Sequence, residues 1–210
     1  MISVALALAL HIQPLEDIIF KRTYTANAES FYSITMVLPG NMGEMKAKVS
    51  TKVKSVQEND AIIHYKILNA TMPGSPDSDA LPELDSKVGT LGIPLKGSIK
   101  TSDMFFVFLG MAGMTSNTKI KVGDTVTTHW QSDSKDCVMD GTGKVNKIDP
   151  EAKTLTVDWK VDMKPNYTDG SVFKLQSIYS TTDFSLTKSE GTTELGGEKM
   201  KITFIRLGKA

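Results

Sequence analysis

Apolar and polar residues alternate along two long segments of the chain. From Met45 to Val53 the odd positions are apolar or threonine, whereas the even positions are lysine or serine. The same pattern returns from Thr154 to Met163. Successive side chains of a β-strand point to opposite faces, whereas a helix would scatter both sets around its axis. Both segments are therefore predicted to be strands with one apolar face and one hydrated face.

Eight further segments are predicted to be strands, and most are enriched in β-branched and aromatic residues. They are residues 18–25, 31–38, 61–69, 125–131, 143–148, 172–179, 184–188 and 200–207. Short polar connections such as Pro39–Asn41, Glu58–Asp60 and Asp149–Lys153 favour antiparallel hairpins. Gly191 and Gly196-Gly197 punctuate the C-terminal run. The predicted fold is mainly β, a single curved antiparallel sheet or half-barrel.

The middle of the chain interrupts this pattern. Residues 73–82 contain three prolines, which cannot donate to a strand ladder, so they are predicted to form a loop. Residues 83–99 are mixed in character, and a strongly apolar window follows them. We therefore predict a short helical or loop segment around residues 83–114, within a single β-rich domain over residues 11–210.

The most apolar window of the chain is Met104–Met114. Its periodicity does not distinguish a short helix from a buried strand. It can be core that plugs the open face of the sheet, or it can line a cavity, since methionine and phenylalanine repack around varied apolar ligands. The candidate ligand-lining residues are Met104, Phe105, Phe106, Phe108, Met111 and Met114, facing Val157, Trp159 and Val161 of the predicted sheet.

The N-terminus carries a short apolar run, Val4–Leu10, that ends in alternating small residues. This pattern is typical of the apolar segment and cleavage site of a secretory signal peptide, which we place at residues 1–10. The alternative is a buried first strand or helical turn. The run is too short to span a bilayer, and no other stretch reaches ~18 apolar residues. We expect a periplasmic or secreted protein that does not span a membrane.

Composition narrows the classes of function. The chain has 210 residues, 40% of them hydrophobic, which is typical of a folded globular domain. It carries 24 Lys+Arg against 24 Asp+Glu, and a net charge of zero argues against nucleic acid as a partner. The single cysteine, Cys137, excludes an internal disulfide and a multi-cysteine zinc site.

Polar residues that could support catalysis or metal binding are few. His11, His64 and His129 lack the H-x-x-x-H spacing of a metal-binding helix. Cys137 could pair with His129 as an activated thiol, but a buried thiol is the favoured interpretation. The chain contains no Gly-rich phosphate loop, G-x-S-x-G, H-E-x-x-H or C-x-x-C motif. We expect no catalytic residues, no metal and no cofactor.

Two charged clusters have a structural and a binding interpretation. Asp133, Asp136 and Asp140 precede Gly141, but Lys135 and Cys137 stand where a calcium loop needs oxygen ligands, so a turn is favoured. Four lysines at positions 46, 48, 52 and 54 share one strand face. They could meet an anionic group, although a solvated face or a lysine-protected edge is favoured.

Several stretches resemble a broad group of bacterial exported proteins of unknown function. They are Lys121–Asp124 before a tryptophan-bearing strand, the Lys144–Met163 hairpin, and Ser180–Asp183 followed by Gly191–Glu194. Those proteins look like the curved antiparallel sheets of the LolA/LolB-like lipoprotein carriers. The similarity is a pattern over most of the chain after residue 17, without a diagnostic motif. It implies a concave apolar surface that holds acyl chains or another hydrophobic ligand.

The expected function is a non-catalytic binding or carrier module for a hydrophobic ligand such as lipid. The alternative is a structural or protein-interaction component of the cell envelope, whose sheet edge or loops meet a partner protein. A carrier requires an apolar pocket, whereas an interaction protein requires an exposed apolar patch or an unprotected edge strand.

Overall fold

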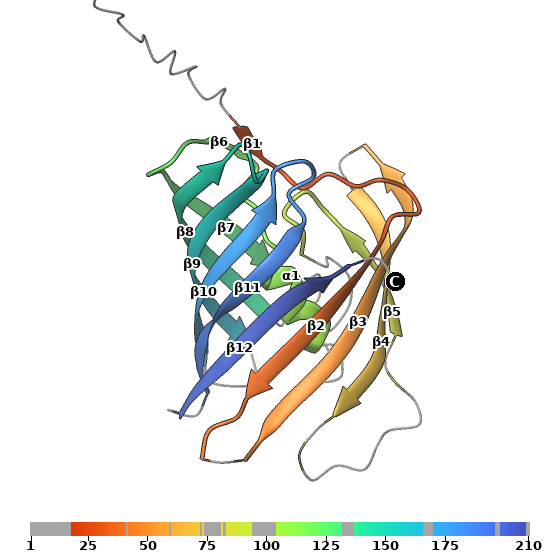
Figure 1. Ribbon diagram of the computed structural model, residues 1–210, viewed down its shortest axis with the longest axis vertical. Coiled ribbons are helices and arrows are strands. Elements are labelled where there is room, and N and C mark those ends of the chain that lie inside the picture. Colours follow the sequence, from red (N-terminus) through yellow and green to blue (C-terminus); the bar gives the residue numbers. More distant parts are fainter. Residues whose placement is uncertain are drawn as a thin grey trace, which may run out of the picture.

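Ten strands form one antiparallel sheet in the computed structural model (Figure 1). The structure describes residues 18–40, 42–58, 60–71, 73, 81, 83–93, 104–131, 137–165, 170–195 and 198–208. From one edge to the other, the strands are β5 (Glu83–Val88), β4 (Asp60–Thr71), β3 (Glu44–Gln57), β2 (Glu29–Val37), β12 (Glu198–Leu207), β11 (Leu186–Leu195), β10 (Ser171–Ser180), β9 (Thr154–Pro165), β8 (Cys137–Asp149) and β7 (Thr125–Gln131).

One pairing joins the two halves of this sheet. Every other neighbouring pair of strands is consecutive in the sequence, but β2 pairs with β12 from Val37 opposite Lys201 to Phe31 opposite Leu207. The first long strand and the last strand therefore lie side by side at the centre. This pairing confirms the prediction of a single antiparallel sheet.

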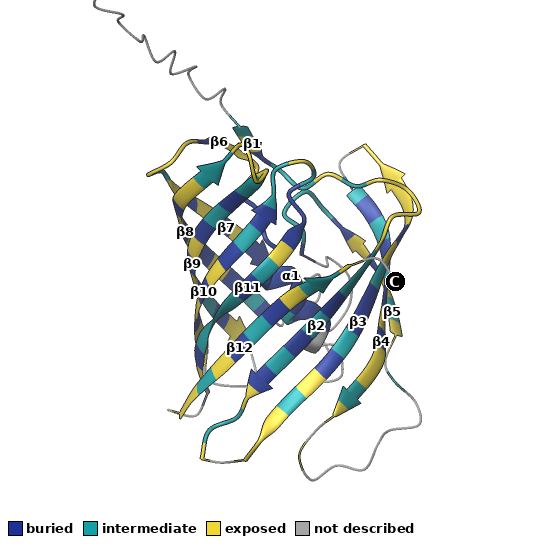
Figure 2. Cartoon of the chain, viewed as in Figure 1, coloured by how far each residue is buried: buried dark blue, intermediate teal, exposed yellow. Residues whose placement is uncertain are grey.

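The sheet is strongly curved and open, as a half-barrel (Figure 1). Register shifts interrupt the pairing at Val53/Ser55 of β3 and at Val145/Lys147 of β8. Bulges of this kind bend a strand and increase its twist. Buried and exposed residues alternate along the strands (Figure 2), most regularly in β7, where every second residue is buried. The buried set faces the inside of the curve, as the sequence pattern predicts.

A short helix, α1 (Met104–Ala112), lies inside the curve of the sheet (Figure 1). The Phe106 ring lies 5.4 Å from the Tyr65 ring of β4, and the Phe108 ring lies 5.4 Å from the Phe173 ring of β10. These strands belong to opposite halves of the sheet, so α1 bridges the interior between them. The apolar window is a helix rather than a strand, which settles the alternative that its periodicity left open.

A two-stranded sheet covers one end of the half-barrel, the upper end in Figure 1. It pairs β1 (Ile18–Phe20) with β6 (Thr118–Ile120). Phe20 is fully buried, and its ring centroid lies 5.0 Å from that of Tyr179 and 5.6 Å from that of Phe184. The small sheet therefore anchors its end of the molecule to the main core through one aromatic cluster.

Several predicted boundaries are wrong, and two of them change the elements expected. The helical or loop segment predicted around residues 83–114 begins with a strand, β5, whose inward positions include the buried Ser86 and Val88. The strand predicted over residues 18–25 ends at Phe20, because the chain then turns and Arg22 N donates to the carbonyl of Thr90 instead of to a strand ladder. The predicted signal peptide, residues 1–10, lies outside the described residues.

Candidate functional site

The predicted ligand-lining residues converge on the interior of the half-barrel. Val157, Trp159 and Val161 are buried on the inner face of β9, and Phe106, Met111 and Met114 are buried on or just after α1. Phe108 is half-buried beside Phe173. The side chains of Met104 and Phe105 lie outside the described part of the chain. The seven described members of the predicted set therefore lie in one packed interior between the helix and the sheet.

Glycines of β8 make room for the largest of these side chains. A Cβ atom at Gly143 would lie 2.8 Å from the Trp159 ring, and one at Gly141 would lie 3.1 Å from the Met114 Cε atom. Neither position can carry a side chain unless these neighbours shift. The sheet and the side chains beneath α1 are therefore packed in direct contact, as expected of a protein interior.

A buried hydrogen-bond network holds the C-terminal end of α1 against the sheet. The Tyr179 hydroxyl donates to the Met114 carbonyl over 2.9 Å and accepts from Trp159 Nε1 over 2.9 Å. Ser177 Oγ donates to the Ala112 carbonyl over 2.9 Å. Burial raises the pKa of Tyr179, so its hydroxyl keeps the proton that it donates. The network satisfies carbonyls that a helix end leaves without partners.

A small cavity of about 40 Å³ remains between α1 and the strands β2, β3 and β4. Its walls include the backbone of Gly110 and Gly113 from the helix side, and the side chains of Tyr32 and Tyr65 from the sheet. One water molecule needs roughly 10–15 Å³ of such space. The cavity therefore suits a few water molecules or one small polar group, and not an acyl chain.

Arg22 borders this cavity. Its Nη1 atom donates to the Phe184 carbonyl over 2.9 Å, and its guanidinium lies 5.7 Å from the centroid of the Tyr24 ring. The Nε atom is buried and has no acceptor within the described residues. Burial opposes the charge of Arg22, but the neighbouring Tyr32, Tyr24 and Asp183 outweigh it and raise the pKa. The guanidinium is therefore charged and incompletely hydrogen-bonded.

The backbone that Arg22 contacts is strained. Phe184 has a φ of 51°, in the left-handed region that bulky residues rarely adopt. Its ring is buried against Phe20. Such strain persists where the surroundings over-determine it, and it gathers at functional sites. Here the ring contact and the bond from Arg22 hold the residue from both sides.

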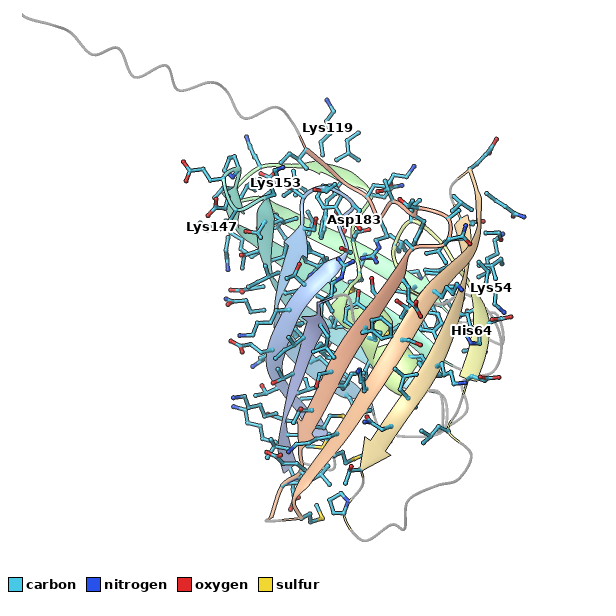
Figure 3. The ribbon with its side chains drawn as sticks, turned by 45° about the vertical axis from the view of Figure 1, so that its right-hand side comes forward. Lys54, His64, Lys119, Lys147, Lys153 and Asp183 are labelled. Atoms are coloured by element: carbon cyan, nitrogen blue, oxygen red, sulfur yellow. The ribbon has the colours of Figure 1, made fainter. Side chains whose placement is uncertain are left out.

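A second arginine, Arg206, lies close by and is hydrogen-bonded through both of its terminal nitrogens. Arg206 donates from Nη1 to Ser185 Oγ over 2.7 Å and from Nη2 to Ser30 Oγ over 2.9 Å. Ser185 in turn donates to Asp183 Oδ1 over 2.7 Å. Burial raises the pKa of Asp183, but the Ser185 hydrogen bonds and both arginines lower it by more. Figure 3 places Asp183 at the same end of the sheet as the small β-sheet.

Two tyrosines beside the cavity, Tyr24 and Tyr65, are neutral. Burial raises the pKa of Tyr24 and of Tyr65 well above the usual value, and Arg22 only partly offsets this. The Tyr24 hydroxyl donates to the Gly89 carbonyl over 2.8 Å. Neither of these two hydroxyls therefore neutralises the Arg22 charge. Sequence reasoning did not identify this group, although Arg22 and Arg206 are the two arginines among 24 basic residues.

The histidines and the cysteine do not assemble into a site. His64 Nδ1 lies 2.7 Å from Asp85 Oδ1, and His129 Nδ1 lies 2.7 Å from Asp140 Oδ1, both on the outer face of the sheet. Cys137 is buried on the inner face, so it does not meet His129. The described residues contain no group of three metal-binding side chains. Of the predicted turn, Asp140 lies inside β8 opposite His129, so the turn is wrong at that residue, while Asp133 and Asp136 lie outside the described residues, as does His11.

The four lysines of β3 belong to an ion-paired outer face. Lys46 lies 2.7 Å from Glu44, Lys54 lies 2.6 Å from Asp85, and Lys48 lies over the Phe31 ring. Lys54 is labelled beside His64 in Figure 3. A wide surface depression of about 560 Å³ includes Lys46 and Lys48 in its walls. Opposite charges neutralise much of this face, which fits the solvated interpretation.

Comparison with known proteins gives little about function. No family model and no curated protein matches the chain. A solved structure from Bacteroides fragilis, described as a "putative exported protein with YmcC-like fold", matches with a TM-score of 0.45 and 9% identity, covering 90% of this chain and 97% of that one. We draw nothing about this chain from a match at that level. Among the described residues, no helix has the length and hydrophobicity that a membrane crossing requires.

Proposed function

We propose that this chain is a non-catalytic, exported binding or carrier module for a hydrophobic ligand such as lipid. One observation carries the proposal: α1, nine residues without a single charge, lies on the concave apolar face of an open sheet. Soluble proteins place ligand sites in concave apolar surfaces of this kind. The likeness to lipoprotein carriers seen in the sequence supports the same role.

The ligand would take the place of α1. The cavity of about 40 Å³ is far too small for an acyl chain, so binding requires the helix to move away from the sheet. A nine-residue helix is marginal on its own in water, and the glycine at position 110 weakens it further. An acyl chain could cover the apolar sheet surface that the helix leaves, and so recover the hydrophobic free energy.

The alternative is a protein-interaction component of the cell envelope. The outer edges of β5 and β7 pair with no other described strand. Unpaired edges present backbone donors and acceptors to which a partner strand can add. Lysine side chains at positions 66 and 87 pair with Glu83 and Asp60 around β5, and such charges discourage edge-to-edge association.

Ligand uptake can be measured with hexadecanol as the probe. Native mass spectrometry should show one added mass per chain, and in a Trp130→Phe variant the fluorescence of the buried Trp159 should shift. Added mass without a Trp159 response would place the ligand elsewhere and refute the interior site. Neither signal at micromolar hexadecanol would refute the carrier function and favour the interaction protein.

Phe108 offers a matched pair of variants for the same assay. Phe108→Asp puts a carboxylate on the helix face that packs against Phe173, which weakens the docking of α1 that the ligand must displace, and should therefore tighten hexadecanol binding by about tenfold or more. Val122→Asp, at a position 53% exposed, should leave binding unchanged. If Phe108→Asp unfolds the protein, Phe108→Ser is the milder substitute. Equal binding by both variants would contradict a ligand beneath α1.

A further inference from the structure

The cavity beside Arg22 has the chemistry of a carboxylate site. Guanidinium carries five N–H donors in a planar fork that matches a carboxylate. In Arg22 the Nη1 atom reaches the Phe184 carbonyl, and the buried Nε atom has no acceptor among the described residues. A buried donor without a partner costs roughly 1–3 kcal/mol, so it marks a place where an acceptor is missing.

We propose that Arg22 binds the carboxylate of an anionic amphiphile, whose apolar chain occupies the site beneath α1. The proposal rests on the function proposed above and adds the ligand class, a long-chain monocarboxylate. The Arg22 cavity adjoins Leu109 and Gly110 of the helix and Gly113 just after it, so a head group there continues directly into the space the helix fills. Its volume of about 40 Å³ accommodates a carboxylate without moving α1.

Arg206, at the same end of the sheet, gives a comparison in which both terminal nitrogens are hydrogen-bonded. Two serine hydroxyls accept from its Nη1 and Nη2 atoms. The Asp183 carboxylate accepts from the backbone N–H and the hydroxyl of Ser185. Neither arginine is within 4.0 Å of a described carboxylate. Arg22 borders the small cavity beside α1, whereas Arg206 borders a separate surface depression that no residue of α1 lines. Arg206 is therefore the matched control.

Acetate tests the head-group site without any acyl chain. Because the chain has two arginines, its ¹⁵N spectrum contains two Nε–H signals from arginine. Acetate, titrated against chloride at equal ionic strength, should shift the Arg22 signal in a saturable way and leave the Arg206 signal in place. Inorganic phosphate in a parallel titration should act more weakly. Movement of neither signal, or of both equally, would overturn the assignment, and a stronger response to phosphate would replace carboxylate by phosphate.

Paired ligands of equal length then test the amphiphile. Palmitate should bind at least about tenfold more tightly than hexadecanol, as expected of hydrogen bonds to a charged group. Arg22→Gln should abolish this preference, Arg22→Lys should keep part of it, and Arg206→Gln should keep all of it. If Arg22 had only a structural role, Arg22→Gln would lower the stability of the protein but would not change the ratio of its affinities for palmitate and hexadecanol.

The outcomes separate this inference from the carrier function. If hexadecanol binds as tightly as palmitate and acetate does not shift the Arg22 signal, the carboxylate site is overturned while the carrier function stands. An acetate response at Arg22 with neither long-chain ligand bound overturns both the amphiphile and the carrier function, and leaves a small-carboxylate site. Gly113→Ala gives an independent check, since its Cβ would have its nearest neighbour at 3.4 Å and would narrow the cavity. It should weaken the acetate response in a folded protein.

Discussion

Replacing Tyr179 with phenylalanine removes one oxygen from the network that holds α1 to the sheet. The ring itself is fully buried beside Phe20 and keeps its packing in the variant. The hydroxyl donates to the Met114 carbonyl and accepts from Trp159 Nε1, so its loss leaves two buried polar groups without that partner. Ala112 keeps its bond from Ser177.

The expected loss in the free energy of unfolding follows from those two buried groups. A buried donor or acceptor left unsatisfied costs roughly 1–3 kcal/mol, which makes about 3 kcal/mol a reasonable expectation for Tyr179→Phe. Typical domains unfold with about 5–15 kcal/mol, so the loss is a substantial part of the total. Tyr24→Phe is the control, because the half-buried Tyr24 hydroxyl makes a single bond to the Gly89 carbonyl. Its expected cost is about 1 kcal/mol.

Urea unfolding followed by tryptophan fluorescence and circular dichroism measures both variants. Tyr179→Phe should lower the midpoint without changing the slope, because the surface exposed on unfolding stays the same. A loss below about 1 kcal/mol, no larger than that of Tyr24→Phe, would refute the reasoning. It would mean that the hydroxyl network does not hold the end of α1 in solution.

Two further substitutions test the fold and its pH dependence. A Cβ atom at Gly191 would overlap the Lys174 carbonyl of the neighbouring strand. Gly191→Ala should therefore lower the free energy of unfolding, measured in urea, by more than about 2 kcal/mol. Gly208→Ala is the control and should have no effect, because there is open space around Gly208. The pKa of Asp183 is lowered, so its stabilisation is present above the unfolded pKa of about 3.9 and is lost as pH falls through the lower folded value. The difference in urea midpoint between the wild type and Asp183→Asn should therefore shrink below about pH 4; a constant difference from pH 7 to pH 2 would contradict this.

Much of the sheet could be predicted because the alternation of apolar and polar residues along a strand indicates which of its faces is buried. Thr125–Gln131 forms a strand with the predicted bounds, and the alternation over Met45–Val53 lies within the longer β3. β5 was missed since a serine, Ser86, fills one of its inward positions and hides the alternation. Hairpin connections such as Asp149–Lys153 were predictable from turn residues.

Glycine misled the sequence analysis for a physical reason. Gly191 was interpreted as a break between strands, yet it lies inside β11, where a side chain would strike the Lys174 carbonyl of β10. The strand predicted from Gly143 likewise lacked the first half of β8, in which Gly141 makes room for Met114, as Gly143 does for Trp159. Glycine marks both a turn and a close approach, and a single sequence does not distinguish the two. Arg22 was missed because its partners come from segments far apart in the chain.

The free energy of docking decides whether α1 is a permanent part of the core or a segment that a ligand can displace, and the composition of α1 does not give that free energy. Its four large buried side chains are Phe106, Val107, Leu109 and Met111. They contribute about 6–12 kcal/mol of burial at roughly 1.5–3 kcal/mol each, as much as the stability of a typical domain. Undocking α1 into water is then nearly as costly as unfolding. Burial of a sixteen-carbon chain returns about 12 kcal/mol at ~0.8 kcal/mol for each methylene, whereas an eight-carbon chain returns about half of that. The filled interior is therefore compatible with a carrier only when the ligand is a long one, since only a long chain replaces what the helix gives up.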